Sequence, residues 1–101
     1  MNYQKVILSG NATNDAQLKT SQNGEVTYVT FSMGVSDAKN NTMFFPVVVF
    51  GNSVEAVAKF VTKGRLVLVD GRLEVNDKNR FSIVADLVRF GPEPVNVKST
   101  G

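Results

Sequence analysis

The sequence of 101 residues has no cysteine, no histidine and no tryptophan. Without thiolates and imidazoles it lacks the usual ligands of transition metals and the commonest general base at neutral pH. The remaining residues offer no motif that would assemble paired carboxylates or an activated nucleophile. We therefore expect no catalytic residue, no metal site and no cofactor, and we do not interpret the protein as an enzyme.

Excess charge and long apolar runs are also scarce. Eleven Lys and Arg stand against nine Asp and Glu, which gives a formal net charge of +2. Because this excess is small, any nucleic-acid site has to depend on where a few cations are placed. The first apolar run, residues 6–8, is far too short for a signal peptide or a membrane span. We expect a soluble, cytoplasmic protein with no membrane partner.

The first half of the chain consists of segments that favour β-strands. Residues 6–8 begin an apolar strand, and the polar stretch after them ends at the turn signal Asn23-Gly24, which predicts a strand and its return. Residues 27–35 alternate between apolar and polar side chains, with Val29, Phe31, Met33 and Val35 on one face. Residues 43–50 are apolar on both faces, so burial of one face does not explain the whole pattern.

The second half contains one helical signal followed by two more strands. Asn52 is placed as an N-cap and Gly64 as the residue after the helix. Residues 65–75 and 81–90 favour β-structure, and the turn at residues 76–79 predicts a hairpin between them. This order is typical of an all-β, five-stranded Greek-key barrel of the OB-fold type, with one short helix between strands 3 and 4.

Residues 1–91 are expected to form this single domain. A chain of 101 residues is long enough to bury one core but too short for two. The sequence from Gly91 to Pro94 would end any strand, and the residues after it are poor in apolar side chains. We expect residues 92–101 to be a flexible C-terminal tail.

Five short motifs carry a resemblance to a known family. They are KVILSGN at 5–11, NG at 23–24, VVVFG at 47–51, KG at 63–64 and VDGRL at 69–73. In this order and spacing they resemble the bacterial single-stranded-DNA-binding protein family, across residues 2–90. The resemblance implies an OB-fold that assembles as a homotetramer or homodimer in the bacterial cytoplasm or nucleoid, or in a phage-infected cell.

The same resemblance implies the function. It is sequence-tolerant binding and protection of single-stranded DNA in replication, recombination or repair, with replication or recombination proteins as further partners and RNA binding left open. One alternative is a primosomal replication protein of the same barrel family that acts mainly through protein partners. Another is an OB-fold module for oligomerisation or interaction, with its aromatic face buried against a neighbour.

Aromatic residues in the third predicted strand are the first candidates for the site. In the family, rings just before this strand and at its end stack on bases, and the resemblance assigns these positions to Phe44 and Phe50. Strand alternation also puts both on one face, so one face of the strand fills the barrel while the other presents rings to bases. The alternative is that either ring covers a core edge or a subunit contact. Tyr28 could stack or hydrogen-bond, or be a plain surface tyrosine.

Basic residues complete the candidate site, and they are Lys5, Lys19, Lys63, Arg72 and Arg80. The three lysines match family positions that follow the phosphates, and Arg72 is an additional cation near the fourth strand. Arg80, beside the 76–79 turn, could reach a phosphate or a base, or pair with Asp77. A lone surface lysine is usually only solvated, so clustering with the rings is what would support this site.

The sequence departs from the family at several places. The loops at residues 36–42 and 76–79 are shorter than the family's long hairpins. Asp37 falls where a stacking Trp is common and Glu74 where a basic residue is common, and both carboxylates would repel phosphate. We therefore expect weaker DNA binding than is typical. The family's acidic-tipped tail has no counterpart in this sequence, and both a natural short form and a truncation would explain this.

Overall fold

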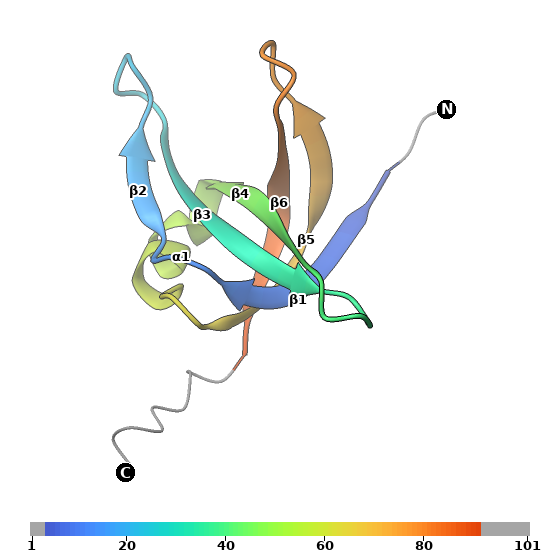
Figure 1. The fold of residues 1–101 in the computed structure, drawn as a ribbon. Helices are drawn as coiled ribbons and strands as arrows, with labels where there is room; N and C mark the ends of the chain where they lie inside the picture. Colours follow the sequence, from blue (N-terminus) through green and yellow to red (C-terminus); the bar gives the residue numbers. More distant parts are fainter. Residues whose placement is uncertain (1–3, 92–101) are drawn as a thin grey trace.

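The computed structural model describes residues 4–91, so the predicted tail lies outside the described residues (Figure 1). Within this range there are six strands, one 3₁₀ turn and one α-helix. In chain order they are β1 (Val6–Ala12), β2 (Gln17–Thr20), β3 (Thr27–Ser36), β4 (Thr42–Phe50), η1 (Gly51–Ser53), α1 (Val54–Phe60), β5 (Leu66–Val75) and β6 (Phe81–Phe90). No helix in the described range is long and apolar enough to cross a membrane.

The strands form one sheet that closes on itself. Their order is β1-β5-β6-β4-β3-β2, and a further pairing of β1 with β3 closes a ring of five strands. The short β2 lies outside the ring, against the first half of β3, and is the predicted return of the first strand. All pairings are antiparallel except that of β4 with β6. The predicted five-stranded barrel, with a helix between its third and fourth strands, is confirmed.

The helix is shorter than the sequence indicated. It begins at Val54 after Ser53, whose side chain makes no capping hydrogen bond, and Asn52 belongs instead to the turn η1. That turn starts at Gly51, whose φ of 87° suits glycine. The three residues of η1 carry the chain out of β4, and the helix begins only after them. The helix then buries Val54 and Val57 against the barrel.

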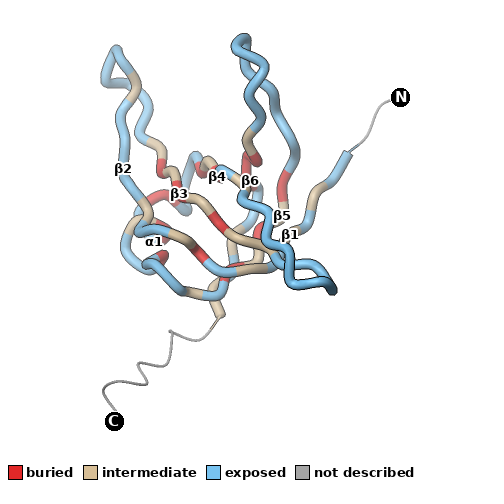
Figure 2. The backbone as a smooth tube through the Cα atoms, in the orientation of Figure 1, coloured by how far each residue is buried: buried red, intermediate tan, exposed pale blue. Residues whose placement is uncertain are grey.

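The core lies inside the barrel. Its fully buried side chains are Met33, Ile83, Val29, Val47, Val49, Val57, Val61, Val67 and Val69. The alternation predicted for β3 is confirmed at Val29, Phe31 and Met33, all of which are buried. Figure 2 shows that the β2–β3 and β5–β6 hairpins extend beyond this core and that their tips are exposed.

The alternation of β6 is interrupted by an irregularity. The sequence predicts one inward face made of Phe81, Ile83, Ala85 and Leu87, yet Phe81 is 44% and Leu87 41% exposed. The register between β5 and β6 shifts at this point: Asp70 is opposite Leu87, whereas the next residue, Gly71, is opposite Ala85. The extra residue in β6 reverses the alternation, so Leu87 points outward. Phe81 lies at the hairpin end of β6, beyond the closed core.

Candidate nucleic-acid interface

The outer face of β3 and β4 is bounded by aromatic rings at both ends. Directly opposed residues of neighbouring strands point to the same side of a sheet. Tyr28 is opposite Phe50 at one end of the pairing, and Gly34 is opposite Phe44 at the other. The residues between them on this face are Thr30, Ser32, Pro46 and Val48. We call this surface the β3–β4 platform.

Both predicted stacking rings are exposed on the platform. Phe44 is 61% and Phe50 49% exposed, and neither belongs to the core. The ring of Tyr28 lies beside that of Phe50, with 5.6 Å between centroids and a tilt of 39°. At the other end Gly34 lies under Phe44, and a Cβ at this position would lie 3.4 Å from Phe44 Cε1, at van der Waals contact. Two exposed rings on a surface of small polar and apolar side chains are suited to stacking on flat ligands.

Lys19 is the cation that lies directly beside the platform. It is opposite Tyr28 in the β2–β3 pairing, so Lys19, Tyr28 and Phe50 form one row across three strands. Its side chain is exposed, and it takes part in none of the ion pairs among residues 4–91.

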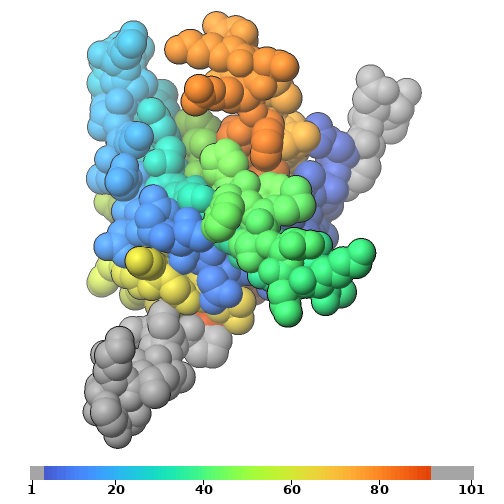
Figure 3. Space-filling model, viewed as in Figure 1, coloured from blue at the N-terminus to red at the C-terminus, as the bar shows by residue number. Residues whose placement is uncertain are grey.

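In Figure 3, viewed as in Figure 1, the β2–β3 hairpin rises on one side of the molecule and the β5–β6 hairpin on the other.

Lys63 lies toward the opposite end of the platform. Its backbone N–H donates to Asp15 Oδ1 at 2.8 Å, which fixes the turn after α1. The carbonyl of Gly64 accepts a hydrogen bond of 3.1 Å from Asn11 Nδ2. Since Asn11 is opposite Gly34, this turn lies near the Phe44 end. The Lys63 side chain is exposed there.

Arg80 is placed at the base of the β5–β6 turn. Its backbone N–H donates to Asn76 Oδ1 at 3.0 Å, and its side chain is exposed. The alternative pairing with Asp77 is not among the ion pairs of the described part of the chain. Arg80 is therefore available at the hairpin tip, away from the centre of the platform.

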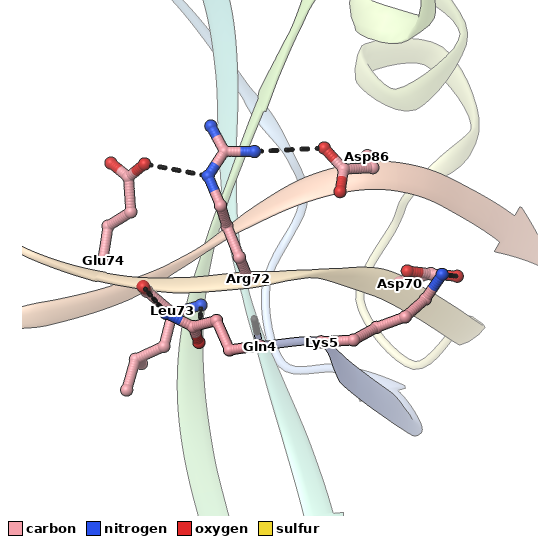
Figure 4. Close-up of polar contacts among 7 residues, drawn as sticks. All are labelled: Gln4, Lys5, Asp70, Arg72, Leu73, Glu74 and Asp86. Atoms are coloured by element: carbon pink, nitrogen blue, oxygen red, sulfur yellow. Dashed lines mark hydrogen bonds and ion pairs between the residues drawn. The ribbon is translucent and has the colours of Figure 1, made fainter. Parts of the chain in front are cut away.

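Arg72 shares the outer face but is already paired. Val48 of the platform is opposite Val84 on β6, and Val84 is opposite Arg72 on β5. The Arg72 Nε donates to Glu74 Oε2 at 3.0 Å and its Nη1 to Asp86 Oδ1 at 3.3 Å (Figure 4). We expected Arg72 to be available to phosphate, whereas the structure places its guanidinium between two carboxylates.

Lys5 is not brought together with the rings. Its Nζ lies 3.2 Å from Asp70 Oδ2, and Lys5 directly precedes the part of β1 that pairs with β5 (Figure 4). Around the sheet, β5 and β6 separate this part of β1 from β4. Lys5 thus lies outside the cluster formed by the platform, Lys19 and the Lys63 turn.

Two polar residues on this face, Gln17 and Asp86, were not predicted from the sequence. Gln17, on β2, is opposite Thr30 and adds an exposed amide to the platform edge. Asp86 reaches Arg72 from the irregular part of β6. The pairing registers would have revealed both, but a register between strands distant in sequence is not visible in local alternation.

Comparison with known proteins gives consistent matches along the chain. Residues 3–88 match the Single-strand binding protein family. A single-stranded DNA-binding protein of Clostridium tetani is 34% identical over 99 residues, covering 85% of this chain and 68% of the relative. One of Staphylococcus aureus strain MRSA252 is 34% identical over 110 residues, covering 95% and 69%. The chain thus spans about two thirds of the length of these relatives.

A solved structure shows the same fold. It is that of the mitochondrial single-stranded DNA binding protein from S. cerevisiae, which superposes with a TM-score of 0.81 over 92% of this chain and 98% of that chain, at 20% identity. This confirms the OB-fold expected from the order of strands and helix. Together with the match over residues 3–88, these findings show that the chain belongs to the single-strand binding protein family.

Proposed function

We propose that this protein binds single-stranded DNA without requiring a particular sequence and protects it during replication, recombination or repair. The observation that carries the proposal is the exposure of Phe44 and Phe50 on the outer face of one strand. Every base has a flat face, so stacking on a ring contributes about 1–3 kcal/mol per base whatever the sequence. Membership of the single-strand binding protein family supports the same function.

The spacing of the rings supports contact with separate bases. Phe44 and Phe50 are six residues apart in β4, which corresponds to roughly 20 Å along an extended strand. At this separation the two rings cannot sandwich one base, so each contacts a different part of the nucleic acid. Tyr28, beside Phe50, enlarges the second stacking position.

Cations around the platform supply the second part of the interaction. The proposed phosphate contacts are Lys19 in the Phe50 row, Lys63 near Phe44 and Arg80 at the hairpin tip, and the exposure of all three supports this role. Neutralising a phosphate releases condensed counterions, so binding weakens as the salt concentration rises. Phosphate contacts of this kind carry no sequence information, which agrees with sequence-tolerant binding.

We also infer the setting in which the protein acts. Family membership supports a homotetramer or homodimer, a location in the cytoplasm or nucleoid, and contacts with replication or recombination proteins. The protein acts as a binder and not as an enzyme, which is supported by the lack of cysteine and histidine and by the character of the family.

The function is tested by titrating labelled oligo-dT and a duplex of equal length at two salt concentrations. The wild type should prefer the single strand and bind it less tightly at the higher salt concentration. Phe44→Ala and Phe50→Ala should each weaken binding by about 1–3 kcal/mol. Phe81→Ala is the matched control, because Phe81 is similarly exposed but contacts Phe45 beside the barrel core, with 6.3 Å between ring centroids. Equal affinity for single strand and duplex, or unchanged affinity in a variant that carries both Phe44→Ala and Phe50→Ala, would contradict the proposal.

A further inference from the structure

Three charged side chains form an exposed cluster beside the platform, which we call the Arg72 clamp. It consists of Arg72, Glu74 and Asp86. Their side chains are 48%, 53% and 62% exposed, so the cluster faces solvent. Two different guanidinium nitrogens are engaged by two different carboxylates, as Figure 4 shows. One positive and two negative charges leave this point of the surface with a net negative charge.

The clamp lies on the same side of the sheet as the stacking rings. Val48 is opposite Val84, and Val84 is opposite Arg72, so β6 separates Arg72 and Glu74 from the platform, while Asp86 lies on β6 itself. Glu74 is opposite Ser82 on the same outward face. Asp86 is the residue passed over where the register shifts, because its neighbours Ala85 and Leu87 are opposite Gly71 and Asp70. The second carboxylate that pairs with Arg72 therefore belongs to the extra residue of the β6 irregularity.

The two borders of the platform therefore differ in charge. On the β2 side, Lys19 lies in the row of Tyr28 and Phe50 and has no ion pair among the described residues. On the β5 side, the only cation of the clamp is held by two acidic groups. A phosphate is attracted to the first border and repelled by the second.

We propose that Glu74 and Asp86 set the edge of the path taken by single-stranded DNA. They occupy the guanidinium of Arg72 and repel phosphate, so the nucleic acid crosses β2, β3 and β4 and is kept off the middle of β5. This inference rests on the proposed function. The role of the two carboxylates on the binding face is to restrict the single-stranded DNA to one path across the protein.

The experiment releases Arg72 and asks whether DNA then uses it. Oligo-dT is titrated over a range of salt concentrations against wild type, Glu74→Gln with Asp86→Asn, Arg72→Gln, and the triple variant. If the released guanidinium neutralises one phosphate, the salt slope steepens by about 0.7, which is about fivefold tighter binding near 0.1 M salt. Glu55→Gln is the matched control for Glu74→Gln, because Glu55 is an exposed glutamate on α1.

We expect the variant with Glu74→Gln and Asp86→Asn to bind oligo-dT more tightly and with a steeper salt dependence than the wild type. Adding Arg72→Gln to this variant should remove the gain. Arg72→Gln alone should leave wild-type binding nearly unchanged. Glu55→Gln should stay close to wild type. A double variant that binds no more tightly would overturn the inference, as would an equal loss from Arg72→Gln in both backgrounds. The single Arg72→Gln variant tests it even if the double variant does not fold. Failure of the wild type to bind oligo-dT would refute the proposed function itself.

Discussion

Gly71 lies at the register shift between β5 and β6, where the backbone of β6 comes close to its Cα. A Cβ at this position would overlap the carbonyl oxygen of Val84 and lie 2.9 Å from the Cα of Ala85. These are backbone atoms, which cannot turn aside as the end of a side chain can. We predict that Gly71→Ala forces the two strands apart and destabilises the barrel.

The expected loss of stability in Gly71→Ala follows from the cost of overpacking, and Gly34 provides the contrasting case. Adding a methyl group to a close-packed site costs about 1–3 kcal/mol, and more when it meets rigid neighbours. We expect Gly71→Ala to lower the free energy of unfolding by about 3 kcal/mol, at the upper end of this range. At Gly34 a Cβ would instead meet side-chain carbons, Thr42 Cγ2 at 3.2 Å and Phe44 Cε1 at 3.4 Å. Since alanine is better than glycine in a strand by roughly 0.5–1 kcal/mol, Gly34→Ala should be nearly neutral.

Thermal unfolding, followed by circular dichroism at one fixed protein concentration, distinguishes these outcomes. A fixed concentration is needed because subunit association would make Tm depend on concentration. For a domain of this size 1 kcal/mol shifts Tm by about 4–8 °C, so Gly71→Ala should unfold roughly 12–24 °C below the wild type. Equal Tm values for Gly71→Ala and Gly34→Ala would refute the reasoning that backbone contact makes Gly71 indispensable.

Two further predictions concern the platform. Gly34→Ala should leave oligo-dT binding close to that of the wild type, because the added methyl would lie 3.4 Å from Phe44 Cε1, at van der Waals contact with an exposed ring, and a loss as large as that of Phe44→Ala would contradict this. Lys19→Gln should make the salt dependence of oligo-dT binding shallower by about 0.7 in slope, whereas Lys5→Gln should not, because only Lys19 lies in the row of stacking rings. Equal slopes for the two lysine variants would show that the assignment of cations to the site is wrong.

Much of the site could be predicted from local alternation. The strand β4 is apolar on both faces, and its alternation separates Val47 and Val49 from Phe44 and Phe50. The structure has the first pair buried and the second exposed. That these rings stack on bases stays a prediction, but their common outward face is confirmed. Side chains alternate along any extended strand, so this property needs no knowledge of the rest of the fold.

Local alternation failed where strands come into close contact. The inward face predicted for β6 is wrong at Leu87, because the register shift reverses the alternation of the strand. Gly71 explains why the shift is sterically possible, yet a single glycine in a strand does not reveal which neighbouring backbone it approaches. The start of α1 was also misplaced, because η1 uses Asn52 to leave β4.

The sequence by itself determined the strands, the short helix, the outward rings of β4 and the absence of cysteine and histidine. These depend on residue types and on a period of two within each segment. Only the tertiary structure decided which cations accompany the rings: Lys19 lies beside Tyr28 in the row of Phe50, Lys5 lies beyond β5, and Arg72 is held by two carboxylates. The physical reason is that barrel closure and pairing register bring together residues far apart in the chain, and no local pattern encodes those partners.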